Sequence, residues 1–185
     1  MTRLDPANYV WWLASRASGI VALVLITASV GLGLTMAAKV VTARGVRPML
    51  ARVHEHTALA GLIAIAVHGI TLLGDAWLNP GLKGVLVPFT MDYKPAYSGL
   101  GTVAGYLAVA LGLSFYARRR IGAKLWRKAH RATVVVYVLA LVHTLGAGTD
   151  AGSSWLRAFM LSTAVPIVVL FAWRVRPVRK LVPAR

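Results

Sequence analysis

Five long runs of apolar residues constrain the fold of this chain more than any other feature. Each run approaches or exceeds about 18 residues with little or no charge, the length that a helix needs to cross the hydrocarbon core of a bilayer. A soluble domain of 185 residues would not be 58% hydrophobic. We therefore predict an all-α integral membrane bundle that forms a single domain over residues 1–185. Its spanning helices are expected at about residues 18–38, 53–73, 99–116, 129–145 and 155–173.

Most of the charged residues lie between these runs. The chain carries 21 Lys and Arg against 5 Asp and Glu, a formal net charge of +16. It contains no basic groove-reading module, so the charge does not predict nucleic-acid binding. The connections at 39–52 and 117–128 and the tail after Trp173 are basic, whereas the other two connections are nearly neutral. Because basic loops stay in the cytoplasm, we expect a multi-pass cell-membrane protein with its N-terminus outside and its C-terminus in the cytoplasm.

Two segments outside the spans have features of their own. Residues 1–15 are expected to be a short interfacial lead rather than a signal peptide, because Trp11 and Trp12 favour the headgroup level and no clear cleavage site follows. The connection at 74–98 contains three prolines and charges that cancel. It is predicted either to fold back onto the membrane face as a lid over a site or to be a plain connector. Within the spans, close helix contacts are expected at four glycines, Gly31, Gly33, Gly101 and Gly105.

Four histidines in the second and fourth runs are the main functional signal. His54 and His68 are 14 residues apart, and His130 and His143 are 13 residues apart. At about 1.5 Å rise per residue, each pair spans roughly 20 Å, about two thirds of the hydrocarbon thickness of a bilayer. Ionisable side chains at such depths are costly and are therefore functional candidates. The expected topology places His54 at the depth of His130, and His68 at the depth of His143.

Matched imidazoles at two depths predict two bis-histidine sites, one above the other, for two hemes. Neutral imidazole is a standard axial ligand of heme iron, and a chain without cysteine offers no thiolate ligand. At about 100° per residue, a 14-residue step returns to within about 40° of the same helix face, so His54 and His68 can face the same side of their helix. His56 is 12 residues from His68, or about 120° off, so we prefer His54 over His56 as a ligand. The step from His130 to His143 is about 140° off, and it requires a frayed helix start, a bend or a π-bulge.

Other roles for these histidines stay open. A single histidine in a membrane helix more often hydrogen-bonds a neighbour or a water, and we expect His56 to be an interfacial or supporting group of this kind. A small metal cluster such as a zinc site is disfavoured, because most of the membrane separates the two depths. A proton relay is disfavoured too, because the apolar runs contain no acidic residue apart from Glu55 at a helix edge.

The sequence resembles the ferric-reductase-type transmembrane superfamily, which includes the heme domains of NADPH oxidases and ferric reductases and the heme-binding subunit of bacterial methionine sulfoxide reductase. The resemblance covers about residues 16–173. It is carried by His54 and His68, Trp126-Arg127-x-x-His130, Leu141-x-His143-x-Leu145-Gly146, Leu86-Val87-Pro88-Phe89 and Gly146-x-Gly148-Thr149-Asp150. It implies b-type hemes held by His54 with His130 and by His68 with His143, and electron transfer across the membrane.

The chain departs from this family pattern in two ways. Glu55 stands where many members have arginine, and the 12 residues after Trp173 are too few for the flavin and nicotinamide domain of larger members. The electron donor is therefore expected to be another protein, such as a cytoplasmic reductase, or a small molecule such as a quinol. We expect a component of an oxidoreductase rather than a complete enzyme.

Three functions follow as hypotheses. The first is a diheme b-type cytochrome that carries electrons between the two membrane faces. The second is a heme-binding anchor subunit that delivers electrons to a separate reductase on the outer side, and the third is a non-redox transporter or scaffold. In the heme hypotheses, Arg52, Arg127 and Arg131 could neutralise the propionates of the cytoplasmic heme, or could simply follow the positive-inside bias. Arg16 could serve the outer heme in the same way.

Overall fold

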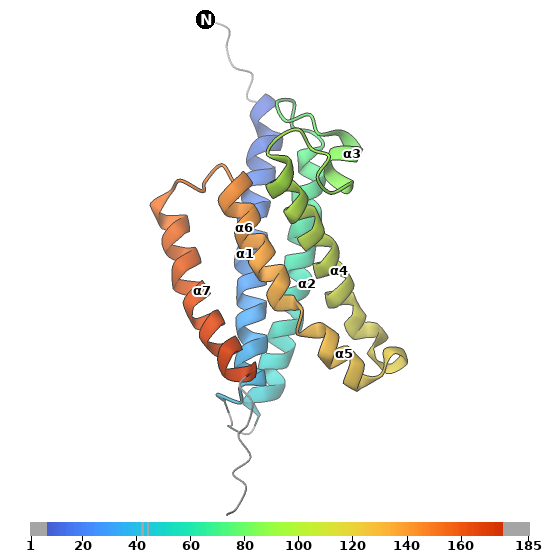
Figure 1. Ribbon diagram of the computed structural model, residues 1–185, viewed down its shortest axis with the longest axis vertical. Helices are drawn as coiled ribbons and strands as arrows, with labels where there is room; N and C mark the ends of the chain where they lie inside the picture. Colours follow the sequence, from blue (N-terminus) through green and yellow to red (C-terminus); the bar gives the residue numbers. More distant parts are fainter. Residues whose placement is uncertain (1–6, 42, 44, 176–185) are drawn as a thin grey trace, which may run out of the picture.

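Five long apolar helical segments in the described residues, the fourth formed by two consecutive helices, are each long enough to cross a membrane, so the chain is a multi-pass membrane protein. The computed structural model describes residues 7–41, 43 and 45–175, and its described part is all-helical. The helices, in chain order, are α1 (Ala7–Ala37), α2 (Val46–Leu72), α3 (Gly81–Leu86), α4 (Pro95–Ile121), α5 (Ala123–His130), α6 (Thr133–Ala147) and α7 (Ser154–Val175). The short α3 marks one end of the bundle and α5 the other (Figure 1). We use "α3 end" and "α5 end" for these two ends.

The helices pack in pairs around α1. This helix lies along α2 and also contacts α6 and α7, while α4 lies along α6 (Figure 1). A core of buried apolar side chains joins α1 to α6 and α7, and it contains Ile26, Val30, Tyr137 and Ile167. The Tyr137 hydroxyl, at the centre of this core, is hydrogen-bonded to the Thr163 hydroxyl of α7 at 3.3 Å. Helices suit this setting because each satisfies its own backbone polar groups without water.

The helices extend beyond the predicted spans at several ends. α1 begins at Ala7, so residues 7–15 of the predicted interfacial lead, Trp11 and Trp12 among them, are helical and continuous with the first span. The two basic connections are also shorter than predicted, because α2 begins at Val46 and α4 continues to Ile121. Lys and Arg are good helix formers, so a helix can continue through them after the apolar run ends. The other predicted part of the lead, residues 1–6, and Arg44 and the tail from residue 176 lie outside the described residues.

The fourth span is broken near its start. α5 ends at His130, Arg131 and Ala132 form a turn, and α6 begins at Thr133. The last turns of α4 and all of α5 therefore project together from the side of the bundle, and α6 then runs through the bundle (Figure 1). The 13-residue spacing predicted a bend or frayed start between the two histidines of this span, and the turn at 131–132 is such a break.

The connection at 74–98 is folded against the α3 end rather than extended. It contains α3, and two side chains of α4 bond to its backbone: the Thr102 hydroxyl donates to the Val85 carbonyl, and the Tyr106 hydroxyl donates to the Leu86 carbonyl. Buried Asp75 begins the segment, and one of its oxygens accepts hydrogen bonds from the backbone N–H groups of Trp77 and Leu78. The segment therefore packs against the α3 end of the bundle, and its role as a lid or as a plain connector stays a prediction.

Candidate functional site

Four histidines meet in two pairs between α2 and the broken fourth span. His54 faces His130 at the α5 end, with ring centres 6.1 Å apart and ring planes at 88°. His68 faces His143 at the α3 end, with ring centres 6.3 Å apart and planes at 72°. The structure thus brings together the same two pairs that the sequence predicted. His56 is exposed on α2 and donates from Nδ1 to the Arg52 carbonyl of its own helix, so it belongs to neither pair.

The spacing within each pair suits one metal ion between the rings. Metal–imidazole bonds are about 2.0 Å long and a ring nitrogen lies about 1.2 Å from the ring centre, so two imidazoles on one metal have centres about 6.4 Å apart. The two histidines of each pair would hold the iron of a heme, and the porphyrin would supply the remaining ligands. The described residues contain no group of three or more His, Asp or Glu side chains that could hold a bare metal ion. The residues therefore fit heme better than a protein-only metal site.

Three of the four imidazoles are fixed by the backbone of a neighbouring helix. Nδ1 of His54 lies 2.8 Å from the Ser29 carbonyl, and Nδ1 of His68 lies 2.8 Å from the Ser15 carbonyl, both on α1. Nδ1 of His143 lies 2.9 Å from the Tyr97 carbonyl of α4. A carbonyl can only accept, so Nδ1 carries the proton in each ring and Nε2 is left as the metal-binding nitrogen. Ligating histidines usually donate their other N–H in this way.

Glycines give these imidazoles room to approach the helix backbone. A Cβ at Gly19 would lie 3.1 Å from Nδ1 of His68, and a Cβ at Gly33 would lie 3.3 Å from Cε1 of His54. A Cβ at Gly101 would overlap the ring of His143. Gly33 and Gly101 are thus at close contacts as predicted, although the partner is a histidine ring. Gly105 makes an ordinary contact with Ile65 of α2, and the prediction for Gly31 is wrong, because a Cβ there would meet nothing within 4 Å.

His130 is held differently. Its Nδ1 is buried and has no hydrogen-bond partner among the described residues. Instead, its ring stacks on the indole of Trp126, four residues earlier in α5, with centres 4.9 Å apart and planes at 27°. The indole N–H donates to the Ser114 hydroxyl of α4 at 3.2 Å, which fixes the indole in turn. Stacking on Trp126 therefore helps to orient this imidazole, whose ring also lies close to the Leu111 backbone of α4.

A cavity of about 620 Å³ surrounds the pair at the α3 end. Such a volume is typical of a site for a drug-sized or cofactor-sized ligand. Its wall is mainly apolar and comes from α1, α2, α4, α6 and the segment at 74–98, and it includes both His68 and His143. Asp75 also lines it, and its second carboxylate oxygen is buried without a partner among the described residues. His54 and His130 are not part of this wall.

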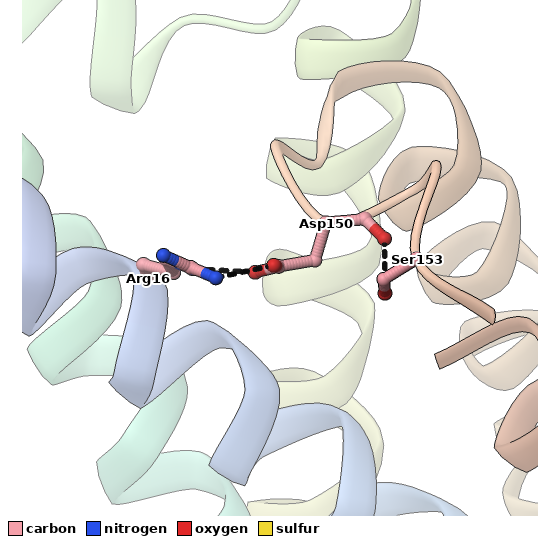
Figure 2. Close-up of polar contacts among 3 residues, drawn as sticks. All are labelled: Arg16, Asp150 and Ser153. Atoms are coloured by element: carbon pink, nitrogen blue, oxygen red, sulfur yellow. Dashed lines mark hydrogen bonds and ion pairs between the residues drawn. The ribbon is translucent and has the colours of Figure 1, made fainter. Parts of the chain in front are cut away.

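An ion pair lies at the wall of the same cavity. The Arg16 guanidinium of α1 donates through Nε to the Asp150 carboxylate at 2.6 Å, and through a second nitrogen to its other oxygen (Figure 2). Asp150 belongs to the connection between α6 and α7, where its carbonyl accepts from the Ser153 hydroxyl (Figure 2). Arg16 also lies 5.1 Å from the centre of the Trp12 ring. The pair therefore ties α1 to the α6–α7 connection beside the histidines.

The other predicted arginines lie at the α5 end. Arg52, Arg127 and Arg131 are exposed, and each is within three residues of His54 or His130 along the chain. Sequence reasoning missed four of the partners on α1 and α4, because backbone acceptors leave no mark in composition. These are Ser15, Ser29, Tyr97 and Gly19. One signal was available: Ser-x-x-x-Gly occurs twice in α1, 14 residues apart, the same spacing as His54 and His68. Asp75 was also missed as a cavity residue.

The comparison with protein families decides the identity of this helical bundle. Residues 18–141, more than half of the chain, match the family model described as "Ferric reductase like transmembrane component". The chain belongs to the ferric reductase-like transmembrane family. The matched range contains His54, His68 and His130 and ends two residues before His143.

Members of the ferric reductase-like family typically bind heme and transfer electrons. This property favours the two redox hypotheses over the transporter or scaffold. A search of curated proteins and a search of solved structures found no significant match to the chain.

Proposed function

We propose that this ferric reductase-like chain is a single transmembrane domain that binds two b-type hemes and transfers electrons from one membrane face to the other. The observation that carries the proposal is the spacing of the two histidine pairs, 6.1 and 6.3 Å between ring centres, each close to that of two imidazoles on one iron. His54 and His130 are the proposed ligands at the α5 end, and His68 and His143 those at the α3 end. Family membership supports heme, and the two depths support two of them.

When bound, each heme would supply one-electron redox chemistry between ferric and ferrous iron. The protein's own contribution is to hold each heme through its histidines and to insulate it from water. The carbonyls of Ser15, Ser29 and Tyr97 keep Nδ1 of their histidines protonated, so Nε2 of each ring would be available to bind the iron. The apolar wall of the cavity excludes water from the α3-end site, and a low dielectric there strengthens the electrostatic effect of each nearby charge.

Arginines are the proposed partners of the heme carboxylates. Arg16 lies on the wall of the α3-end cavity, so a propionate there would share this guanidinium with Asp150. Arg52, Arg127 and Arg131 are the candidates at the α5 end, where they are exposed near His54 and His130. Their charge also suits a cytoplasmic location, so we propose that the α5 end faces the cytoplasm and the α3 end faces outside. The N-terminus would then be outside and the C-terminus inside.

An optical spectrum tests the proposed function directly. Expression with ample heme should give a purified chain with a strong Soret band and about two hemes per protein, because each histidine pair binds one iron. Pyridine hemochrome analysis together with protein quantification gives the ratio. A purified chain without Soret absorption would overturn the proposal, and a ratio of one would overturn its diheme version.

Cysteine labelling tests the orientation, and the absence of native cysteine gives this experiment a clean background. Thr149→Cys, exposed in the α6–α7 connection, should react with a membrane-impermeant maleimide in intact cells. Lys124→Cys, exposed on α5, should react only after the membrane is permeabilised. The reverse pattern would show that the α5 end faces outside and would overturn the proposed topology.

A second candidate function is delivery of electrons to a separate reductase at the α3 end. The segment at 74–98 favours it, because Trp77 and Leu82 are 76% and 65% exposed there, beside the cavity that holds His68 and His143. Exposed aromatic and aliphatic side chains next to a redox site suit a docking protein as well as the membrane interface. Co-purification of a stable redox partner from native membranes, lost in a Trp77→Ser/Leu82→Ser variant, would support this role over a stand-alone cytochrome.

A further inference from the structure

The segment that joins the third span to the fourth carries a dense positive charge. We call residues 118–131, the last turn of α4 together with α5 and its adjoining turns, the basic hairpin. No Asp or Glu occurs between residues 95 and 149. The cations of the basic hairpin are Arg118, Arg119, Arg120, Lys124, Arg127, Lys128 and Arg131, and all but Arg118 are exposed. Among the described residues, none of them is ion-paired. The described part of the chain thus leaves this charge to an anion from outside.

The side chains of α5 form three rows along the helix. Trp126 and His130, four residues apart, stack on each other and face the bundle. Leu125 and Ala129 form a second row, which is exposed. The third row is cationic and follows the spacing i, i+3, i+4 and i+7 of one helix face, with Lys124, Arg127, Lys128 and Arg131. The bundle therefore uses one face of α5, and it leaves an apolar row and a cationic row exposed.

The basic hairpin lies beside the bundle. The last turns of α4 and all of α5 project together from its side, and α4 is the main neighbour of α5 (Figure 1). Lipid headgroups surround the ends of spanning helices, so a segment that projects sideways there lies over lipid. A helix of eight residues is too short to be stable alone in water, so α5 depends on its surroundings. A basic helix with an exposed apolar row is typical of segments that lie in a membrane interface.

We propose that the basic hairpin binds acidic phospholipid headgroups in the membrane leaflet at the α5 end. The cationic row of α5, together with the exposed Arg119 and Arg120, bonds the lipid phosphates, while Leu125 lies among the upper acyl chains. This role is separate from electron transfer and needs no heme. It also differs from the general excess of positive charge at one membrane face, because it assigns the lipid contact to one projecting structure and not to all basic connections alike.

An acidic soluble protein is the other kind of partner that this charge could attract. The apolar side chains beside the cations favour lipid. Leu125 on α5 and Ile121 at the end of α4 are 60% and 40% exposed. Burial among acyl chains removes such side chains from water, whereas the surface of an acidic protein would cover them with charged groups.

Native mass spectrometry of the purified full chain tests the lipid preference. The chain is equilibrated in detergent with equimolar phosphatidylglycerol and phosphatidylcholine that carry the same acyl chains. We expect phosphatidylglycerol adducts to exceed phosphatidylcholine adducts. Lys124→Gln/Lys128→Gln should lower this preference several-fold, because it removes half of the cationic row and keeps Arg127 and Arg131. An unmodified chain that binds both lipids equally would overturn the proposal.

A charge-matched variant controls for the general effect of positive charge. Lys39→Gln/Arg47→Gln removes two exposed cations near the connection between α1 and α2, which lies at the opposite end of the bundle from α3 (Figure 1). This variant should keep the preference for phosphatidylglycerol. Equal losses in the two double variants would show that net charge, and not the basic hairpin, selects the lipid, and would overturn the proposal. Circular dichroism shows whether both variants keep their helices.

A spin label on α5 gives a second test in which the cationic row stays intact. Leu125→Cys takes a nitroxide label in a chain that has no cysteine of its own. In nanodiscs of phosphatidylcholine and phosphatidylglycerol, we expect oxygen, which concentrates in lipid, to relax this label more than a water-soluble nickel complex does. A label at Lys124→Cys, on the cationic row, should respond more to nickel. A Leu125→Cys label that also responds more to nickel would place α5 in water and overturn the proposal.

These measurements separate the inference from the proposed function, since neither depends on heme. A chain that prefers phosphatidylglycerol but binds no heme keeps the inference and overturns the proposed function. A chain with two hemes and no lipid preference keeps the proposed function and overturns the inference, and the basic hairpin would then suit an acidic soluble protein.

Discussion

Replacing His68 or His143 with alanine is expected to remove the heme at the α3 end and leave the heme at the α5 end in place. Each substitution deletes one of the two imidazoles that face each other at 6.3 Å, and neither residue contacts the pair at the other depth. The heme content should fall from about two to about one per chain, measured by pyridine hemochrome analysis and by the number of components in a redox titration.

The histidine outside both pairs provides the control for this experiment. His56→Ala removes an exposed imidazole that is bonded only to its own helix, so the heme content should be unchanged. Circular dichroism in the detergent used for purification shows whether each variant keeps its helices. Equal retention of both hemes in His68→Ala or His143→Ala would contradict the assignment of these two residues as ligands.

Gly101→Ala should weaken heme binding at the α3 end although it removes no ligand. A Cβ at this position would overlap the ring of His143 and push the imidazole away from the Tyr97 carbonyl. Changes to groups that orient a metal ligand typically lower affinity by about 10–100-fold, and we expect an effect of this size in heme titrations of the apoprotein.

Gly105→Ala is the matched control, because it lies one turn later on α4 and a Cβ there makes an ordinary 3.6 Å contact with Ile65. Both changes exchange glycine for a better helix former, so they share any effect of backbone propensity. A Gly101→Ala chain that binds heme as tightly as the Gly105→Ala chain would contradict the role given to the glycine beside His143.

Several structural features could be predicted from single residues and their spacing. The five apolar runs determine the number of spans, because a bilayer admits only segments that satisfy their own backbone and present apolar side chains. The number of residues between the histidines of each span predicted the depths of all four, His54, His68, His130 and His143. It also gave the break in the fourth span, since a straight helix cannot turn both of its histidines to one side across 13 residues. The predicted spans begin after the start of α1 and finish before the end of α4. A span predicted from hydropathy ends with the apolar run, whereas a helix can continue through Arg and Trp.

The sequence by itself determined the membrane setting, the number of spans and the depths at which imidazoles occur. Only the tertiary structure decided what holds those imidazoles. Gly31 and Gly33 look alike in the sequence, yet one faces open space and the other lies against His54. The two positions point in directions about 200° apart around the helix axis. Packing against α2, α6 and α7 sets the rotation of α1 about its axis and so decides which of the two faces a neighbour. Backbone acceptors such as the Ser29 carbonyl occur at every residue, so which of them meets a histidine depends on how two helices approach each other in space.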